Sequence, residues 1–530
     1  MVKRRKFNTT GICIPELHYM VDMSDRIEMI INEYIAYGEY FTINRARQYG
    51  KSTILELLYH RMNADYLVLD ISFEAADDCF VSMHALAQGF VNKISRVLAG
   101  GNAPEELLEI WKKPIAPELP LDALGEKITM FCRASKKEVI LMVDEVDKAA
   151  DNQIFLHFLG LLREKYLRQK VGRDDTFKSV ILAGVHDIKN LKMKLHPGES
   201  SSYNSPWNIA AEFHIDMGFS VSDIQGMLSE YEEDRQTGMD ISAMGKLIYE
   251  YTSGYPFLVS YLCKLLDEKV IHMEGYSDRR SVWTRKGLQE AVKILVKGPN
   301  TLYDDMIKHI SEYPKLSMML QNILFRGAEY PYHVYNEAIH IGQMFGFVKE
   351  KGDIVVISNR IFETQLYSYF ISEELSKDAE LRSTIPDKNQ FVRSGGLDMD
   401  LVMRKFFDYY ISLYRQEDEK FVEEHGRKIF LIYLKPIING GGNFYVEAET
   451  RDKTRTDIII DYGGIQHVVE TKIWRGEEYN KEGENQLLGY LTHYNLKKGY
   501  LLSFDFNKKR KNVGIREKIY NGKMIMEVVV

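Results

Sequence analysis

The spacing of apolar and polar residues in the first third of the chain predicts strands that alternate with helices. Residues 38–43, 139–145 and 179–185 are short apolar runs with β-branched or aromatic side chains, which is typical of buried strands. Residues 52–62 place apolar side chains at helical spacing instead. Alternation of this kind predicts an α/β unit built on a parallel sheet.

The later part of the chain predicts two hairpins. Residues 346–358 form two apolar runs around the turn residues Lys351, Gly352 and Asp353. Residues 457–462 and 466–474 are apolar strands joined by a Gly-Gly turn. The second pair is preceded by a helical stretch over residues 401–434 and followed by a further strand in "KGYLLSFDF".

Length and composition restrict the class of protein. A chain of 530 residues divides into several domains, and 45% hydrophobic with 27% charged residues is the composition of a folded soluble protein. No apolar run reaches the roughly 18–20 residues that span a bilayer, and no apolar segment follows the basic N-terminus as in a signal peptide. Four scattered cysteines show neither a disulfide framework nor zinc spacing, so a cytoplasmic location is expected.

The segment "NRARQYGKST", residues 44–53, lies between a predicted strand and a predicted helix, where a phosphate-binding loop belongs. Its backbone N–H groups and the helix dipole would face phosphate oxygens, with Gly50 allowing close approach. Lys51 would reach the β- and γ-phosphates, and Ser52 would hold Mg²⁺. Arg45 stands where the motif has its first glycine, so the alternative is a helix cap without a ligand.

A second motif favours the nucleotide site. The apolar run 139–145 ends in Asp144 and Glu145, which predicts a carboxylate on Mg²⁺ and a second carboxylate that orients the attacking water. The run 179–185 is followed by His186, which is either a γ-phosphate sensor or an ordinary turn residue. Because the N-K-x-D run that would signal guanine is absent, ATP is the expected nucleotide.

These motifs together resemble the bacterial AAA-ATPase-like family, among the STAND-type signalling ATPases, over roughly residues 6–260. The resemblance rests on "HYMVD", "YFTINRARQYGKST", "VDEVDK" and "LAGVHDIKNL", and it makes the R-x-R-x-x-G-K-[S/T] loop a family trait. It implies nucleotide contacts from Arg45, Arg47 and Thr53. Gly254 and Pro256 match the G-x-P motif of the helical lid, although Pro256 is equally consistent with an ordinary helix start.

Residues 301–375 combine helices with the first hairpin and resemble the winged-helix module that follows the lid in STAND ATPases. A regulatory spacer is favoured here over a DNA-binding module. Residues 376–400 lack a sustained apolar period and contain Pro386 and a Gly-Gly pair, which predicts a linker.

The second predicted hairpin carries a candidate metal site. Glu470 and Lys472 are two residues apart on one strand and therefore share a face, while Asp457 opens the partner strand. Two carboxylates and a lysine are the composition of a Mg²⁺ site for phosphodiester hydrolysis, with Mn²⁺ as a possible substitute metal. The alternative is a solvated, charged hairpin face. Apolar neighbours such as Val469 and Trp474 favour the site, because they predict a buried strand.

Residues 401–530 resemble the PD-(D/E)xK nuclease superfamily, most closely the branch fused behind AAA-ATPase-like domains. The resemblance assigns the metal to Asp457 and Glu470 and the catalytic lysine to Lys472. It also matches Gln486 and Tyr490 to a Q-x-x-x-Y element and offers Glu424, or the adjacent Glu423, as a helix ligand. Thr456 replaces the usual proline. The basic run 508–511 is either a DNA-backbone contact or a solvated turn.

The sequence therefore predicts a multidomain α/β protein. The expected domains are a P-loop NTPase core with a parallel sheet (1–240), a helical lid (241–300), a winged-helix region (301–375), a linker (376–400) and an α/β restriction-endonuclease-like domain (401–530). The expected function is an ATP-binding and ATP-hydrolysing switch coupled to a Mg²⁺-dependent nuclease that acts on nucleic acid, with DNA favoured. The resemblance implies a role in defence against mobile DNA or in the processing of mobile or damaged DNA, and the sequence leaves the biological purpose open. A homo-oligomer formed on ATP binding is a further expectation. The alternative is a regulatory ATPase whose nuclease-like domain is an inert recognition module.

Overall fold

The computed structural model describes most of the chain, namely residues 4–74, 76–101, 103–146, 153–185, 192–194, 202–204, 206–276, 278–326, 328–377, 388–393, 396–414, 419–438, 442–447, 457–474, 477–505 and 512–530. Its contacts divide the chain into two compact units. The first contains residues 1–236, 254–261 and 344–346, and the second contains residues 237–253, 262–343 and 347–530.

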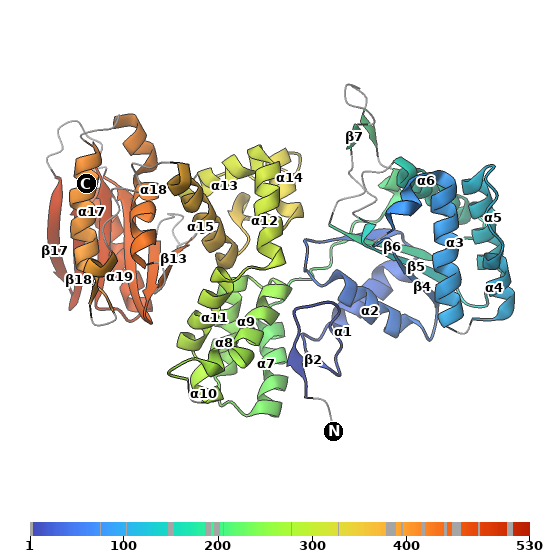
Figure 1. The fold of residues 1–530 in the computed structure, drawn as a ribbon, viewed down its shortest axis with the longest axis horizontal. Helices are drawn as coiled ribbons and strands as arrows, with labels where there is room; N and C mark the ends of the chain where they lie inside the picture. The colour runs from blue at the N-terminus through green and yellow to red at the C-terminus, as the bar shows by residue number, and fades with distance from the viewer. Residues whose placement is uncertain are drawn as a thin grey trace. The chain divides into compact units, whose positions relative to one another are not determined.

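The first unit is built on a four-stranded sheet in which every pairing is parallel (Figure 1). Its strands, in the order β3-β6-β5-β4, are β3 (Phe41–Asn44), β6 (Ser179–Gly184), β5 (Val139–Asp144) and β4 (Leu67–Ser72). Parallel strands need long crossovers, and these contain α2 (Lys51–Met62), α3 (Met83–Gly100), α4 (Glu105–Lys112), α5 (Pro120–Ala134) and α6 (Gln153–Lys170). The predicted parallel α/β sheet is confirmed, and this arrangement fits a P-loop NTPase-like fold.

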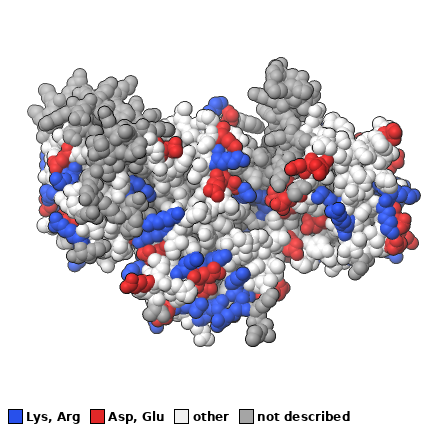
Figure 2. Space-filling view, viewed as in Figure 1, with Lys and Arg blue, Asp and Glu red and all other residues white. Residues whose placement is uncertain are grey.

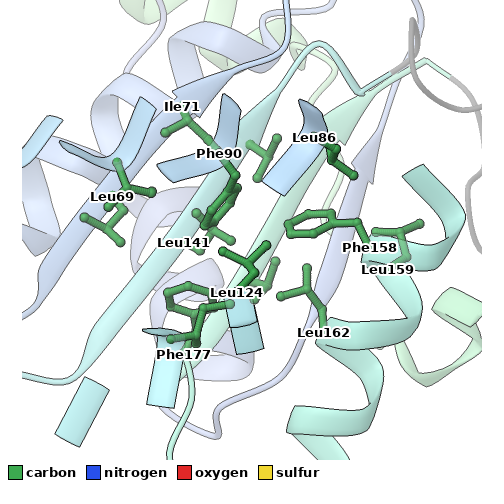
Figure 3. Close-up of a cluster of buried hydrophobic side chains, with 14 of the residues drawn as sticks. Leu69, Ile71, Leu86, Phe90, Leu124, Leu141, Phe158, Leu159, Leu162 and Phe177 are labelled. Carbon is green, nitrogen blue, oxygen red and sulfur yellow. The ribbon is translucent and has the colours of Figure 1, made fainter. Parts of the chain in front are cut away.

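One face of this sheet carries a large apolar core (Figure 3). Leu69 and Leu141 project from neighbouring strands, and Phe90, Leu124 and Phe158 reach them from α3, α5 and α6. Burial of each large apolar side chain stabilises the fold by about 1.5–3 kcal/mol. Because side chains alternate across a strand, Asp144 at the end of β5 points to the opposite face from Leu141.

Shorter elements complete the first unit. They are β1 (Lys6–Phe7) paired with β2 (His18–Tyr19), α1 (Ser24–Ile30), a π-helical turn (Ile31–Ile35), 3₁₀ turns (Asp77–Phe80 and Pro206–Ile209), β7 (Lys192–Lys194) paired with β8 (Ser202–Asn204), and α7 (Val221–Arg235). Helix α7 begins with a capping box in which the Ser220 hydroxyl accepts from the Asp223 N–H and the Asp223 carboxylate accepts from the Ser220 N–H.

The second unit begins with helices. They are α8 (Ile241–Thr252), α9 (Pro256–Glu268, whose residues up to 261 belong to the first unit), a 3₁₀ turn (Val270–His272), α10 (Arg279–Val282), α11 (Arg285–Lys297), α12 (Thr301–Glu312), α13 (Pro314–Arg326), α14 (Glu337–Met344) and α15 (Arg360–Lys377). Helix α9 begins at Pro256 as the sequence predicts. The first predicted hairpin is also confirmed, as β9 (Val348–Lys351) pairs antiparallel with β10 (Ile354–Ile357).

A six-stranded mixed sheet ends the second unit (Figure 1). Its order is β13-β14-β15-β16-β18-β17, with β13 (Gly442–Glu447), β14 (Asp457–Tyr462), β15 (Ile465–Ile473), β16 (Lys498–Phe504), β17 (Gly514–Tyr520) and β18 (Lys523–Val529). Strands β14 and β15 form the predicted antiparallel hairpin, and both glycines of its turn have positive φ. Strand β16 runs parallel to β15 after the crossover helix α19 (Glu477–His493).

The helical stretch predicted over residues 401–434 is confirmed in the described residues, which form α17 (Met399–Tyr414) and α18 (Glu419–Ile438); α18 continues past Pro436. One detail differs from the expectations. The predicted linker contains a 3₁₀ turn (Lys388–Phe391) and a short antiparallel pair, β11 (Val392–Arg393) with β12 (Gly396–Leu397), because Gly396 and Leu397 can extend and pair locally.

Helix α19 and the helices α17 and α18 lie on opposite faces of the six-stranded sheet. Helix α19 lies on the face of Leu501, where Gly499 lets Leu487 and Leu491 approach the strand closely. Helices α17 and α18 contact Phe504, which points to the other face: the Tyr410 ring lies 5.5 Å from it, and Gly426 lies against it. In the described part of the chain, no helix is both long and apolar enough to cross a membrane.

Candidate functional site

The phosphate-loop segment connects β3 to α2 at the carboxyl end of the parallel sheet, which is where ligands bind in open α/β folds. Gly50 precedes α2 with φ of +84°, and no atom would contact a Cβ there, so glycine is needed for its backbone conformation rather than for space. Lys51 is folded over the loop: its Nζ donates to the carbonyl oxygens of Arg45 (3.0 Å) and Ala46 (3.1 Å). The lysine therefore already lies inside the turn that would hold a phosphate.

The second predicted motif meets the first one. The Ser52 hydroxyl donates to Asp144 Oδ2 at 2.6 Å, although 92 residues separate them. A hydroxyl and a carboxylate oxygen are the hard donors that Mg²⁺ prefers, so these two side chains fit the ion implied by the motif. Asp144 Oδ1 accepts from the N–H of Glu145, whose φ of 55° is unusual for a residue other than glycine. Such a conformation is held in place by the surrounding structure.

A further carboxylate, that of Asp70, lies close enough to Asp144 to feel its charge. Burial, followed by the charges of Asp144 and Glu56, raises the pKa of Asp70 on β4 to about 6. Asp70 was not among the site residues predicted from the sequence. Its signal was an acidic residue inside the apolar strand "LVLDIS", where a charge needs a reason.

The other residues assigned to the nucleotide have different surroundings. The Arg45 guanidinium donates to the carbonyl oxygens of Asn44 and Ile215 and lies 5.3 Å from the Phe213 ring centroid. Burial lowers the pKa of Arg45. The Thr53 hydroxyl accepts from the N–H of Cys13 at 3.2 Å. Thus Arg45 and Thr53 contact other parts of the first unit as well as bordering the loop.

Contacts that no motif indicated also hold the loop. Tyr255, next to Gly254 of the G-x-P element, donates through its hydroxyl to the carbonyl oxygen of Arg47 at 2.5 Å, and its ring packs edge-on against Tyr49. Gly254 has φ of +74°, and a Cβ there would lie 2.0 Å from the Phe219 carbonyl oxygen. His186 lies outside the described residues.

The second candidate centre lies on β15 and α19. Lys472 Nζ is 3.3 Å from Glu470 Oε1 and donates to Gln486 Oε1 at 2.7 Å. The side chains of Lys472 and Glu470 are only 6% and 2% exposed, so this is a buried charge pair and not a solvated hairpin face. Gly483 on α19 lets the helix approach the Lys472 stem, since a Cβ there would lie 3.3 Å from Lys472 Cγ.

The structure describes the other residues that the sequence assigned to this centre only in part. Asp457 opens β14, as the sequence predicted, and the register makes it the Cα partner of Glu470 on the neighbouring strand. Tyr490 lies one helical turn after Gln486 on α19. The side chains of Asp457 and of Glu424, on α18, lie outside the described residues, as do residues 508–511. Among the side chains that are described, no three His, Cys, Asp or Glu residues gather in a metal-binding arrangement. The described part of the centre supplies one buried carboxylate, a donor that fits Mg²⁺.

Further charged residues lie on α19 and on the same face of the sheet as Glu470, and they were not predicted from the sequence. Glu484 and Glu527 are nearly or fully buried and share Lys518 between them. On the face of the molecule in Figure 2, acidic and basic side chains are interspersed, which agrees with the net charge of -7.

Comparisons with known proteins provide no family assignment. No protein-family model matches the chain, and no curated protein matches it. Three solved structures share part of its shape: a Walker-type ATPase, PABY2304, of Pyrococcus abyssi (12% identity, 68% of this chain, 99% of that chain, TM-score 0.43), the Aeropyrum pernix ORC2 protein in ADPNP-ADP complexes (11%, 69%, 98%, 0.39) and the Aeropyrum pernix ORC1 protein in complex with DNA (11%, 67%, 94%, 0.31). Identities and TM-scores this low assign no function to the chain.

Proposed function

We propose that this chain is an ATP-binding and ATP-hydrolysing switch coupled to a Mg²⁺-dependent nuclease. The hydrogen bond between Ser52 and Asp144 supports the first half, because it joins two motifs that the sequence identified independently. The buried group of Lys472, Glu470 and Gln486 supports the second half. We also propose the STAND-type classification, the five domains given above, a cytoplasmic location and assembly into a homo-oligomer on ATP binding.

At the nucleotide site, a phosphate oxygen would replace the loop carbonyls that now accept from Lys51 Nζ. Ser52 and Asp144 would hold Mg²⁺, which neutralises charge on the β- and γ-phosphates. Glu145 would orient the attacking water from the end of β5. Arg45, Arg47, Thr53 and His186 remain proposed contacts around the nucleotide.

At the nuclease site, Lys472 would contact the scissile phosphate and stabilise the negative charge that develops on it. Gln486 fixes the direction of the Lys472 ammonium group through a 2.7 Å hydrogen bond. Asp457, Glu470 and the helix residue Glu424 would hold Mg²⁺, or Mn²⁺ in its place, and a bound ion would supply the means of activating the attacking water. Tyr490, on the same flank of α19 as Gln486, would contact the bound nucleic acid. DNA is the proposed substrate.

The test of the nuclease is cleavage of plasmid and single-stranded DNA by the purified full chain with Mg²⁺ or Mn²⁺. Lys472→Met should abolish cutting. Lys498→Met is the matched control, because Lys498 also donates to a carboxylate, that of Asp400, but on the opposite face of the same sheet. If both variants cut like the wild type, the assignment of Lys472 is wrong; if the wild type is inert while ATP still binds, the inert-module alternative replaces the nuclease.

The test of the switch is ATP binding by calorimetry, followed by the cleavage assay with and without ATP. Lys51→Met should lose ATP binding, whereas Lys127→Met, which removes a lysine bonded to the Ile110 carbonyl elsewhere in the first unit, should keep it. Equal ATP affinity in wild type and Lys51→Met would refute the nucleotide site. Cleavage that ignores ATP in an ATP-binding protein would refute the coupling.

A further inference from the structure

A group of four polar side chains connects α19 to the far edge of the C-terminal sheet. We call Glu484, Lys518, Tyr520 and Glu527 the Glu484 cluster. Glu484 accepts from Lys518 Nζ through Oε1 and from the Tyr520 hydroxyl through Oε2, both at 2.5 Å. Lys518 Nζ also lies 3.0 Å from Glu527 Oε2. Burial lowers the pKa of Lys518, and the hydrogen bonds to both carboxylates more than offset that effect, so its pKa is raised.

This cluster lies on the same face of the sheet as the proposed nuclease centre. The register runs from Glu470 to Leu501 and from Leu501 to Glu527, so these three side chains project to one face. Helix α19 covers that face. Residues of a helix turn by about 100° each, so Glu484 and Gln486 lie about 200° apart and leave α19 on opposite flanks. One flank therefore contacts the Glu484 cluster, and the other contacts Lys472.

The apolar contacts and the hydrogen bonds between α19 and the sheet constrain the helix differently. Leu487 and Leu491 pack around Gly499 and supply apolar burial, which is not directional and tolerates small rotations of the helix. Hydrogen bonds are directional and weaken quickly with distance and angle. A shift of α19 by about 1 Å would stretch the bond from Lys472 to Gln486 out of range. Burying two glutamates is costly for stability alone, so a role in fixing geometry accounts for them better.

We propose that Glu484 is a positioning residue for the nuclease centre, acting through α19. By holding one flank of the helix against Lys518 and Tyr520, it fixes the rotation at which Gln486 meets Lys472. The proposal rests on the proposed nuclease function for its consequence, but not for its geometry. Nothing in it requires Glu484 to touch the nucleic acid or a metal ion.

The chain contains a matched control for this cluster. Asp400 at the start of α17 also accepts from a lysine and a tyrosine, Lys498 (2.6 Å) and Tyr500 (2.8 Å). It lies on the opposite face of the same sheet, where Tyr500 pairs in register with Val469. Glu484→Gln and Asp400→Asn therefore remove the same charge from the same kind of contact, and only the first should disturb Lys472.

The first measurement is DNA cleavage with Mg²⁺ by the full chain. Glu484→Gln should lower kcat by about 10–100-fold with KM within about twofold, as changes that support a site through its immediate ligands do. Asp400→Asn should stay near the wild-type rate. Combining Glu484→Gln with Gln486→Ala should add little to either single change, because both act through the same contact. Equal rate losses in Glu484→Gln and Asp400→Asn would show a general structural role and overturn the proposal.

The second measurement needs no nuclease activity. Lys472 is buried and hydrogen-bonded, so it should react slowly with an amine-acylating reagent, as read by peptide mass spectrometry. Glu484→Gln should raise its labelling rate several-fold, and Asp400→Asn should not. Unchanged labelling in Glu484→Gln would overturn the positioning role even if the enzyme cuts DNA. Increased labelling in a protein that never cuts would uphold the positioning and refute the nuclease. If Glu484→Gln fails to fold, Tyr520→Phe, which removes one of the two hydrogen bonds, takes its place with the same expected direction.

Discussion

Asp461 on β14 is a buried carboxylate, and replacing it by asparagine should stabilise the second unit at neutral pH. The residue is 0% exposed, and among the described residues neither carboxylate oxygen has a hydrogen-bond partner. Burial raises the pKa of Asp461 to about 6; Lys293 and Arg285 on α11 act in the opposite direction, and Glu290 adds to the rise.

The sign and size of the effect follow from this shift. The ordinary pKa of the group is 3.8, so between about pH 4 and pH 6 the folded state holds a proton that the unfolded state has lost. Stability therefore falls as the pH rises through that window. A difference of about two pH units at about 1.4 kcal/mol each gives about 3 kcal/mol. Tyr251 on α8 also faces this group, but burial raises its pKa to about 12, so it keeps its proton throughout.

The assay is urea denaturation of the full chain at pH 4.5 and pH 7.5, read by hydrogen exchange in β14 and β15. Asp461→Asn should exceed the wild type in stability at pH 7.5 by up to about 3 kcal/mol and by much less at pH 4.5. Asp400→Asn is the control of opposite sign: despite its burial, hydrogen bonds from Lys498 and Tyr500 lower the pKa of Asp400. A gap between Asp461→Asn and wild type that is equal at both pH values would refute the reasoning.

Three further changes test the first unit, each by thermal denaturation. Gly254→Ala should cost at least about 2 kcal/mol, because the new Cβ would strike the Phe219 carbonyl in a left-handed backbone; a loss below 1 kcal/mol would contradict that geometry. Trp207→Phe should cost about 1–3 kcal/mol by removing the indole that donates to the Thr42 hydroxyl at 2.9 Å, and Thr42→Val in the same background should recover part of it. Ser220→Ala should cost about 1 kcal/mol by removing the cap of α7, whereas Ser220→Asp should be nearly neutral.

The nucleotide site could be predicted from local sequence patterns, because a parallel sheet brings the carboxyl ends of its strands together. Each apolar strand delivers its last residue to the same edge, so two motifs that end such strands, or follow them, must meet there. This is why Ser52 and Asp144 could be paired from the sequence. The environment of Arg45 could not be predicted, because its partner Ile215 is 170 residues away in a segment without a motif.

In the C-terminal sheet, the alternation of side chains along a strand predicted which residues share a face, but it did not predict which strands are neighbours. Alternation correctly placed Glu470 and Lys472 on one face, and the Gly-Gly turn correctly predicted the hairpin of β14 and β15. The pairing of Asp457 with Glu470 is a register that the structure adds. Predicting the Glu484 cluster would also have required the strand order. Strand β18 lies between β16 and β17, so the strand at the edge of the sheet, which carries Lys518, is not the last strand in the sequence. Strand order of this kind is a property of the whole sheet, and spacing along the chain does not contain it.

In both candidate centres a lysine donates to oxygen atoms, Lys51 in the first and Lys472 in the second. The groups that supply these oxygen atoms differ in a way that fits the proposed roles of the two lysines. Lys51 Nζ donates to two carbonyl oxygens of its own loop, and a bound phosphate, which carries more negative charge, would compete with them for the lysine. Lys472 is bonded to a carboxylate on a buried strand and to an amide on a helix that is itself fixed by a second polar contact. The first arrangement suits a group that exchanges partners when a ligand binds, as a switch must. The second suits a group that is aimed before the substrate arrives, as electrostatic stabilisation of a transition state requires.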